Sequence, residues 1–174
     1  MTAATILPPD GLDVTIGGLP RDELRNELRS RGILLNAQAE TLLADAAFDE
    51  APAPQVISMV ERTVGDLGLP HGAPLSQILA IAGNLGLCLC PPITGPYLRL
   101  ALAQQATAGD SIMSSGRAPS GSLTVAAQPR RDDDAYPKGF YLRVVNSQAW
   151  LRGYTCDDEH LWSPEDRFAF QSPS

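Results

Sequence analysis

The sequence predicts an α+β protein in which an α-rich N-terminal half packs on a small antiparallel β-sheet with a central hairpin at about residues 140–155. Two observations lead to this prediction. Apolar residues recur at helical spacing in the first half of the chain, whereas they alternate with period two in the last third. The sheet should consist mainly of residues 122–127, 140–145, 149–155 and 167–171.

The length of 174 residues suits one domain, and a chain of this size buries about 70% of the surface that its unfolded form exposes. We expect a single domain over 1–174, with an α-rich part at 12–103, a long loop at 104–121 and a β-rich part at 122–174. The loop prediction rests on a run of Ala, Ser, Gly, Thr and Pro, in which one short strand at 111–114 is expected.

A short strand at 12–16 and two helices are expected in the first fifty residues. The first helix begins after Pro20, which is favoured in a first turn, and ends near Gly32. The second begins at Asn36, a good N-cap residue, and continues to about Ala47. We expect the two helices to form a helical hairpin that packs on the core.

The middle of the chain should add a strand, a helix and two shorter segments. Apolar and polar residues alternate over 55–63, which favours a strand, with a short helix as the alternative. A helix from Pro74 to about Gly86 carries a broad apolar stripe, so it should be substantially buried. Residues 87–90 can form a short strand, and the pattern over 97–103 is ambiguous.

The hairpin prediction rests on alternation over 140–154, with Asn146 and Ser147 at the turn. Asn tolerates positive φ better than any other residue except Gly. The predicted register pairs Val144 with Ala149, Arg143 with Trp150, Leu142 with Leu151 and Tyr141 with Arg152. One face is then apolar or small and belongs to the core (Phe140, Leu142, Val144, Ala149, Leu151 and Gly153). A slip by one residue would mix the two faces, so the pattern specifies the register.

Charge and composition exclude several classes of protein. The net charge of −7 argues against general nucleic-acid binding, which relies on clustered Lys and Arg. No apolar run reaches the roughly 18 residues of a membrane span, and the N-terminus lacks the features of a secretory leader. Three cysteines cannot all pair within the chain, which agrees with a reducing compartment. We therefore expect a soluble, cytoplasmic protein, and the abundance of Arg, Ala, Gly and Pro indicates a bacterial source.

Several stretches stand out: Lys-Gly-Phe-Tyr-Leu-Arg at 138–143, Trp-Leu-Arg-Gly-Tyr at 150–154, Cys-Asp-Asp-Glu-His-Leu-Trp-Ser-Pro-Glu-Asp-Arg-Phe at 156–168, and Leu-Arg-Ser-Arg-Gly-Ile-Leu-Leu-Asn-Ala-Gln-Ala-Glu-Thr-Leu-Leu at 28–43. In these stretches the chain resembles a group of small uncharacterised bacterial proteins, and the resemblance covers most of its length. Members are sometimes labelled "helicase", but the resemblance implies no activity. Two motor domains do not fit in this length, and Lys138 precedes Gly-Phe instead of ending a phosphate-binding Gly-Lys-Ser/Thr loop, so the protein should not be a helicase or P-loop NTPase.

The main candidate site is the second face of the hairpin. It interleaves guanidinium groups with aromatic rings, and Arg, Trp and Tyr dominate binding hot spots. Mutual stacking without a ligand is the structural alternative. The predicted ligand-binding residues are Tyr141, Arg143, Trp150, Arg152 and Tyr154.

A second candidate lies in the 156–160 loop, where Asp157, Asp158 and Glu159 precede His160. Adjacent carboxylates and an imidazole are the parts of an acid–base or divalent-cation site. Asp157, Asp158 and His160 are therefore the catalytic candidates, although an exposed polar loop at the end of a hairpin is the stronger explanation for them.

A third candidate is a zinc site made by Cys88, Cys90, Cys156 and His160. The spacing Leu-Cys-Leu-Cys-Pro is more typical of a small apolar core segment than of a zinc knuckle. We expect neither a metal nor a cofactor.

The function expected from these residues is binding. The partner would be a protein or a small anionic or aromatic molecule, and neither nucleic acid nor a membrane. The alternative is a small metal-assisted or acid–base hydrolase that uses the loop from Cys156 to His160. The sequence leaves the oligomeric state open.

Overall fold

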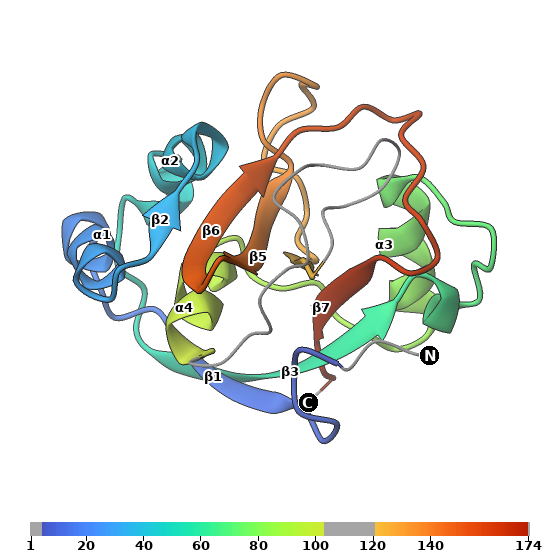
Figure 1. Ribbon diagram of the computed structural model, residues 1–174, viewed down its shortest axis with the longest axis horizontal. Helices are drawn as coiled ribbons and strands as arrows, with labels where there is room; N and C mark the ends of the chain where they lie inside the picture. Colours follow the sequence, from blue (N-terminus) through green and yellow to red (C-terminus); the bar gives the residue numbers. More distant parts are fainter. Residues whose placement is uncertain (1–4, 103–120, 174) are drawn as a thin grey trace.

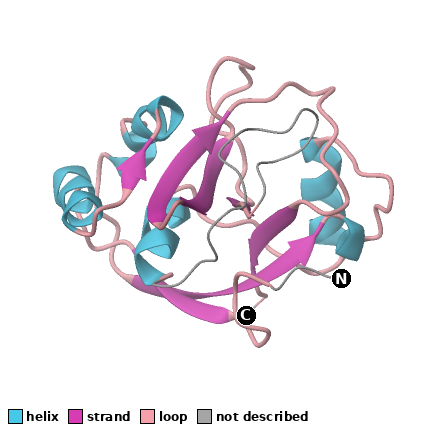
Figure 2. Ribbon diagram, in the orientation of Figure 1, coloured by secondary structure: helices cyan, strands magenta, loops and turns pink. Residues whose placement is uncertain are grey.

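A curled, seven-stranded mixed β-sheet forms the centre of the fold, with helices on either side of it (Figures 1 and 2). The computed structural model describes residues 5–102 and 121–173. The predicted loop at 104–121, with its short strand at 111–114, lies almost entirely outside the described residues. Within the described part of the chain, no helix is long and apolar enough to cross a membrane.

The strand order is β1-β3-β7-β4-β5-β6-β2. The pairs β4–β7 and β2–β6 are parallel and the others antiparallel. The strands are β1 (Leu12–Ile16), β2 (Leu34–Leu35), β3 (Gln55–Thr63), β4 (Leu123–Val125), β5 (Gly139–Val145), β6 (Gln148–Tyr154) and β7 (Arg167–Gln171).

The mixture of helices and strands is as predicted, but the prediction of a small antiparallel sheet beside an α-rich N-terminal half is wrong. Three of the seven strands, β1, β2 and β3, come from the N-terminal half. Strand β3 lies between β1 and β7 and joins the two halves of the chain in one sheet. The alternation over 55–63 indicated this strand correctly, but its partners lie about 45 and 110 residues away, beyond the reach of a local pattern.

The helices are α1 (Arg21–Ser30), α2 (Ala37–Leu43), α3 (Leu75–Asn84) and α4 (Thr94–Ala101), with the 3-10 turns η1 (Ala46–Phe48) and η2 (Gly65–Leu67). Pro20 and Pro74 immediately precede α1 and α3, as predicted. Helix α4 replaces the ambiguous segment at 97–103. The predicted strand at 87–90 is reduced to a single bridge between Cys88 and Gln171.

Helices α1 and α2 lie side by side in opposite directions, since Arg25 pairs with Glu40 and the Arg21 Nε donates to the Leu43 carbonyl. The predicted helical hairpin did not include β2, which lies between the two helices in the chain. Leu34 and Leu35 pair in parallel with Trp150 and Leu151 of β6. Asn36 then caps α2, since its Oδ1 accepts a hydrogen bond of 2.8 Å from the N–H of Ala39. A strand of two residues is too short to show an alternating pattern. Helix α2 also ends earlier than expected, at Leu43.

The hairpin of β5 and β6 has the predicted register throughout, including Leu142 opposite Leu151 and Arg143 opposite Trp150. Asn146 and Ser147 have φ values of 51° and 66°, the left-handed conformation that a tight two-residue turn requires. The turn and the alternation together therefore determined this part of the fold.

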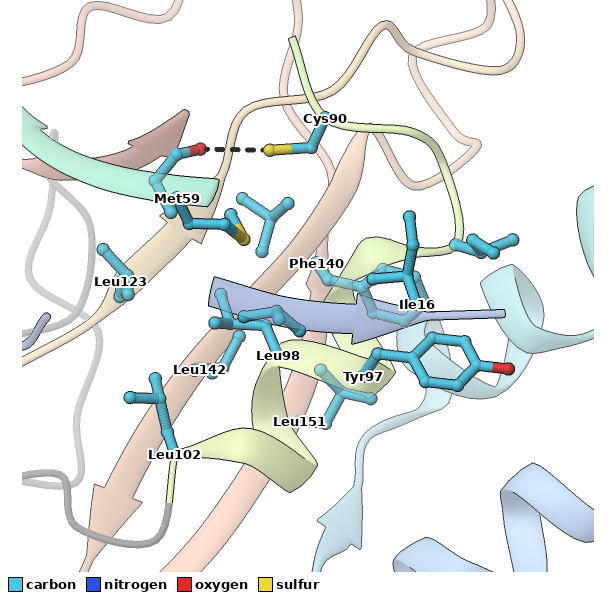
Figure 3. Packing of buried hydrophobic residues seen from close by; sticks show 14 of the residues in the cluster. Ile16, Met59, Cys90, Tyr97, Leu98, Leu102, Leu123, Phe140, Leu142 and Leu151 are labelled. Atoms are coloured by element: carbon cyan, nitrogen blue, oxygen red, sulfur yellow. Dashed lines mark hydrogen bonds between the residues drawn. The ribbon is translucent and has the colours of Figure 1, made fainter. Parts of the chain in front are cut away.

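Two hydrophobic clusters lie on the two sides of the sheet. The first packs the sheet against α1, α2 and α4 and contains Leu98, Leu142 and Leu151, each fully buried (Figure 3). The second packs it against α3 and contains Ile78, Trp162, Phe168 and Phe170. Strand β7 shows the division, because Ala169 points into the first cluster and its neighbours Phe168 and Phe170 into the second.

Candidate functional site

Four of the five predicted ligand-binding residues line one surface hollow of about 370 Å³ beside β6. They are Tyr141, Trp150, Arg152 and Tyr154, joined by Asn36, Gln38, Gly153 and Thr155. We call this the Arg152 hollow. It lies where β2 stops and α2 begins, so the strand edge beyond Leu151 is not covered by a neighbouring strand.

Arg152 lies on the indole of Trp150, with its guanidinium carbon 4.2 Å from the ring centroid. Both residues are partly exposed. The predicted register, which the structure confirms, places Arg143 directly opposite Trp150, yet Arg143 is not the residue that lies on this ring. The stacking partner is instead the residue two positions along the same strand, which shares the face of Trp150.

Arg143 does not line the hollow, because its side chain is fully buried, at 0% exposure. The expected recognition face is thus divided into an inner, buried part and an outer part that is open to solvent. Alternation identified the face correctly, but it carries no information on which portion other segments cover.

The two tyrosines at the inner wall belong to a row of aromatic rings that leads into the second cluster. The Tyr141 and Tyr154 centroids lie 6.5 Å apart, Tyr154 and Trp162 5.3 Å, and Trp162 and Phe168 4.9 Å. Burial raises the pKa of Tyr154 far above its usual value, so this phenol stays neutral. The inner wall of the hollow is therefore a fixed part of the core.

Asn36 fixes the other wall, because its side-chain amide pairs with the backbone of Gly153. The Asn36 Nδ2 donates to the Gly153 carbonyl at 3.0 Å, and the Gly153 N–H donates to the Asn36 Oδ1 at 2.9 Å. A Cβ on Gly153 would lie 2.7 Å from the Gln38 carbonyl carbon, so only glycine lets α2 approach this closely. The sequence indicated Asn36 as a cap alone, and these wall residues were missed.

Arg152 retains unused hydrogen-bonding capacity. Its Nε is buried and has no hydrogen-bond partner among the described residues. Stacking on Trp150 fixes the plane of the guanidinium, and the edge of that plane carries the donors that match a carboxylate in a two-point contact. The arrangement is suited to holding a planar anion.

The 156–160 loop, the second candidate, forms a hydrogen-bonded turn. One oxygen of Asp157 accepts from the N–H groups of Glu159 and His160, at 3.0 and 2.8 Å. The His160 imidazole packs edge-on against Trp162, with ring centroids 5.5 Å apart. Asp158 is exposed, and it lines a different hollow together with Asp157 and Cys156 but without His160. The geometry thus gives these residues structural contacts and no acid–base pair with His160.

The cysteines of the proposed zinc site are in three different environments. Cys88 is exposed, whereas Cys90 is buried, donates to the Ala169 carbonyl at 3.6 Å, and has its pKa raised to about 12 by burial. Burial also raises the pKa of Cys156, so its thiol is not activated as a nucleophile. In residues 5–102 and 121–173, no group of three or more His, Cys, Asp and Glu side chains could hold a metal ion, so Cys88, Cys90, Cys156 and His160 do not form the zinc site.

Comparison of the chain with protein-family models, curated proteins and solved structures finds no significant match. The resemblance to small bacterial proteins therefore stays a prediction.

Proposed function

We propose that the protein is a binding protein of the cytoplasm that holds a planar anionic group, a carboxylate next to an aromatic ring, in the Arg152 hollow. One observation carries the proposal: a guanidinium fixed on an indole at 4.2 Å, with a buried Nε that has no described partner, borders a hollow of about 370 Å³. Binding pockets for small molecules begin at roughly this size.

The walls of the hollow support an aromatic group beside the anion. Tyr141 and Trp150 supply ring surfaces, and Asn36 and Gln38 bring polar groups from the start of α2. The anchoring of Asn36 to Gly153 holds the two walls at a fixed separation before any ligand arrives. Such preorganisation lowers the entropic cost of binding.

Charge supports a small ligand or a single protein side chain over a nucleic acid or a membrane surface. The chain has a net charge of −7, and among the described residues Arg152 is the only basic one that lines the hollow. One cation can neutralise one carboxylate but cannot track a phosphate backbone. Three free cysteines are compatible with a reducing compartment.

The test is a titration with benzoate, followed by the indole N–H resonances of the two tryptophans in NMR spectra. Trp150 lines the hollow and Trp162 is buried, so benzoate should shift the Trp150 signal and leave that of Trp162 nearly unchanged. Arg152→Lys keeps the charge and loses the planar fork, so it should weaken benzoate binding by about tenfold or more.

The matched control is Arg29→Lys, which changes an exposed arginine on α1 and should bind benzoate as the wild type does. Benzylamine, which has the same ring and the opposite charge, should not compete. If Arg152→Lys binds benzoate with unchanged affinity, or if benzylamine binds equally well, the proposal is wrong.

A further inference from the structure

Lys138 is the only lysine in the chain, and its side chain is 93% buried, with 7% exposure. It precedes β5, and its N–H donates to the Tyr154 carbonyl at 2.8 Å, which continues the ladder between β5 and β6. The ladder therefore fixes the backbone from which the ammonium extends. The aliphatic stem is covered, whereas the ammonium at its end still meets solvent.

The described residues place little negative charge close to the Lys138 ammonium. The nearest carboxylate is that of Asp134, whose Oδ1 lies 3.9 Å from the Lys138 Nζ and whose side chain is 66% exposed. That distance is too long for a hydrogen bond. By contrast, Arg167 and Glu61 form a buried ion pair at 2.6 Å. Lys138 thus has a covered side chain, an ammonium that still reaches solvent, and one distant, exposed carboxylate beside it.

Lys138 lines a second hollow, of about 460 Å³, which we call the Lys138 groove. One wall is apolar and consists of Leu75, Leu79 and Ala80 from α3, with Leu89 beside them. The opposite side is formed by the segment before β5 and by the segment after β6, which crosses toward α3 (Figure 1). The polar residues on that side are Gln128, Arg131, Asp132, Cys156, Asp157 and Asp158.

We propose that the Lys138 groove is a second binding site, independent of the Arg152 hollow, and that it takes an amphipathic monocarboxylate. The carboxylate would bind the Lys138 ammonium, and its aliphatic chain would lie along Leu75 and Leu79 of α3. This ligand matches the groove, because its anion can pair with the Lys138 ammonium while its chain covers the apolar wall.

The charge of the groove favours one carboxylate over a more highly charged anion. Arg131 and Lys138 contribute two positive charges, but Asp132, Asp157 and Asp158 contribute three negative ones. A phosphate dianion or a polyanionic surface would meet these carboxylates and be repelled. A monoanion that pairs with Lys138 meets less of that repulsion, because it carries half the charge of a dianion.

Calorimetric titration with octanoate tests the proposal. The variant Lys138→Met keeps the length of the side chain and removes its charge, so it should weaken octanoate binding by about tenfold or more. Arg29→Met removes an exposed cation from α1 and should leave the affinity unchanged. Across hexanoate, octanoate and decanoate, each pair of added methylenes should tighten binding, by at most about fourfold per methylene.

A second variant separates binding from folding. Leu79→Asn places a polar group on the apolar wall at a half-buried position, and it should weaken octanoate binding without loss of the fold. The proposal is overturned if either variant binds octanoate as the wild type does. It is also overturned if the wild type gives no heat with octanoate at millimolar concentration, or if octylamine binds as tightly as octanoate.

Discussion

The Arg152 hollow and the Lys138 groove both present a basic residue to a surface depression, but they hold that residue in different ways. Arg152 is partly exposed and rests on an aromatic ring at 4.2 Å. Lys138 is buried, and its nearest carboxylate is 3.9 Å away. A guanidinium stacked on an indole is stable without a ligand, because the ring stabilises its charge on one face and water solvates the rest. The ammonium at the end of a covered side chain has lost part of its hydration, so it gains more from an anion than a surface ammonium does.

The largest effect is expected at Glu61, which shows what a buried charge with its full set of partners contributes. Its carboxylate pairs with Arg167 at 2.6 Å and accepts from the N–H groups of Ile6 and Leu7, at 2.8 and 2.9 Å. Glu61→Ala should lower the free energy of unfolding by about 3–5 kcal/mol, measured in urea. A loss below about 1 kcal/mol would mean that buried charges in this protein need no partner, and the contrast with Lys138 would disappear.

Leu151 gives the corresponding value for the apolar face of the hairpin, opposite the face that carries Arg152. It is fully buried and lies across from Leu142. Leu151→Ala should cost about 2–5 kcal/mol by the transfer and cavity contributions, again by urea unfolding. If the loss stays under about 0.5 kcal/mol, the assignment of the two faces is inverted.

Asp45 offers a third buried charge, and this one depends on pH. Burial by itself raises the pKa of Asp45, but hydrogen bonds from Tyr136, Ala47 and Arg130 outweigh burial and lower it below the ordinary 3.8. Since the folded pKa is depressed, the stabilisation is complete above about pH 4 and is lost as the pH falls through the folded pKa.

Asp45→Asn should therefore destabilise the protein at pH 7 by about 1–3 kcal/mol, and the difference from the wild type should shrink below pH 3.8. Thermal unfolding at a series of pH values measures it. A difference that is constant from pH 7 to pH 3 would show that the charge of Asp45 contributes nothing.

The smallest effects are expected at Arg152 and Lys138 themselves. Arg152→Ala removes the contact with Trp150 and should lower the free energy of unfolding by only about 0.5–1 kcal/mol in the absence of ligand. Lys138→Met should leave stability unchanged or raise it, because the covered part of the side chain keeps its length and only a partly desolvated charge is lost. The opposite order, with Lys138→Met the more destabilising, would remove the distinction between the two sites.

Local patterns predicted the elements whose partners are close in the sequence. The hairpin followed from alternation and from the turn residues Asn146 and Ser147, and α1 and α3 followed from Pro20 and Pro74. Strand β2 was missed, because two residues show no period. The mixed sheet was also missed, since its central pairing joins β3 to β7 across more than 100 residues.

The candidate site was likewise predicted only where its residues lie close together in the sequence. Alternation gave four of the residues that line the Arg152 hollow, but Asn36 lies 117 residues from its partner Gly153. Burial of Arg143 and Lys138 depends on segments distant in the chain, so neither could be inferred from the residues around them. The Lys138 groove needs α3 and the segments beside β5 and β6 together, and no sequence motif marks it.

One measurement tests the difference between the two sites most directly: calorimetric titration of wild type, Arg152→Lys and Lys138→Met, each with benzoate and with octanoate. The proposed sites predict that Arg152→Lys loses affinity for benzoate and keeps it for octanoate, whereas Lys138→Met shows the reverse. If both variants lose both ligands together, or if neither variant changes either affinity, the two hollows are not the separate anion sites described above.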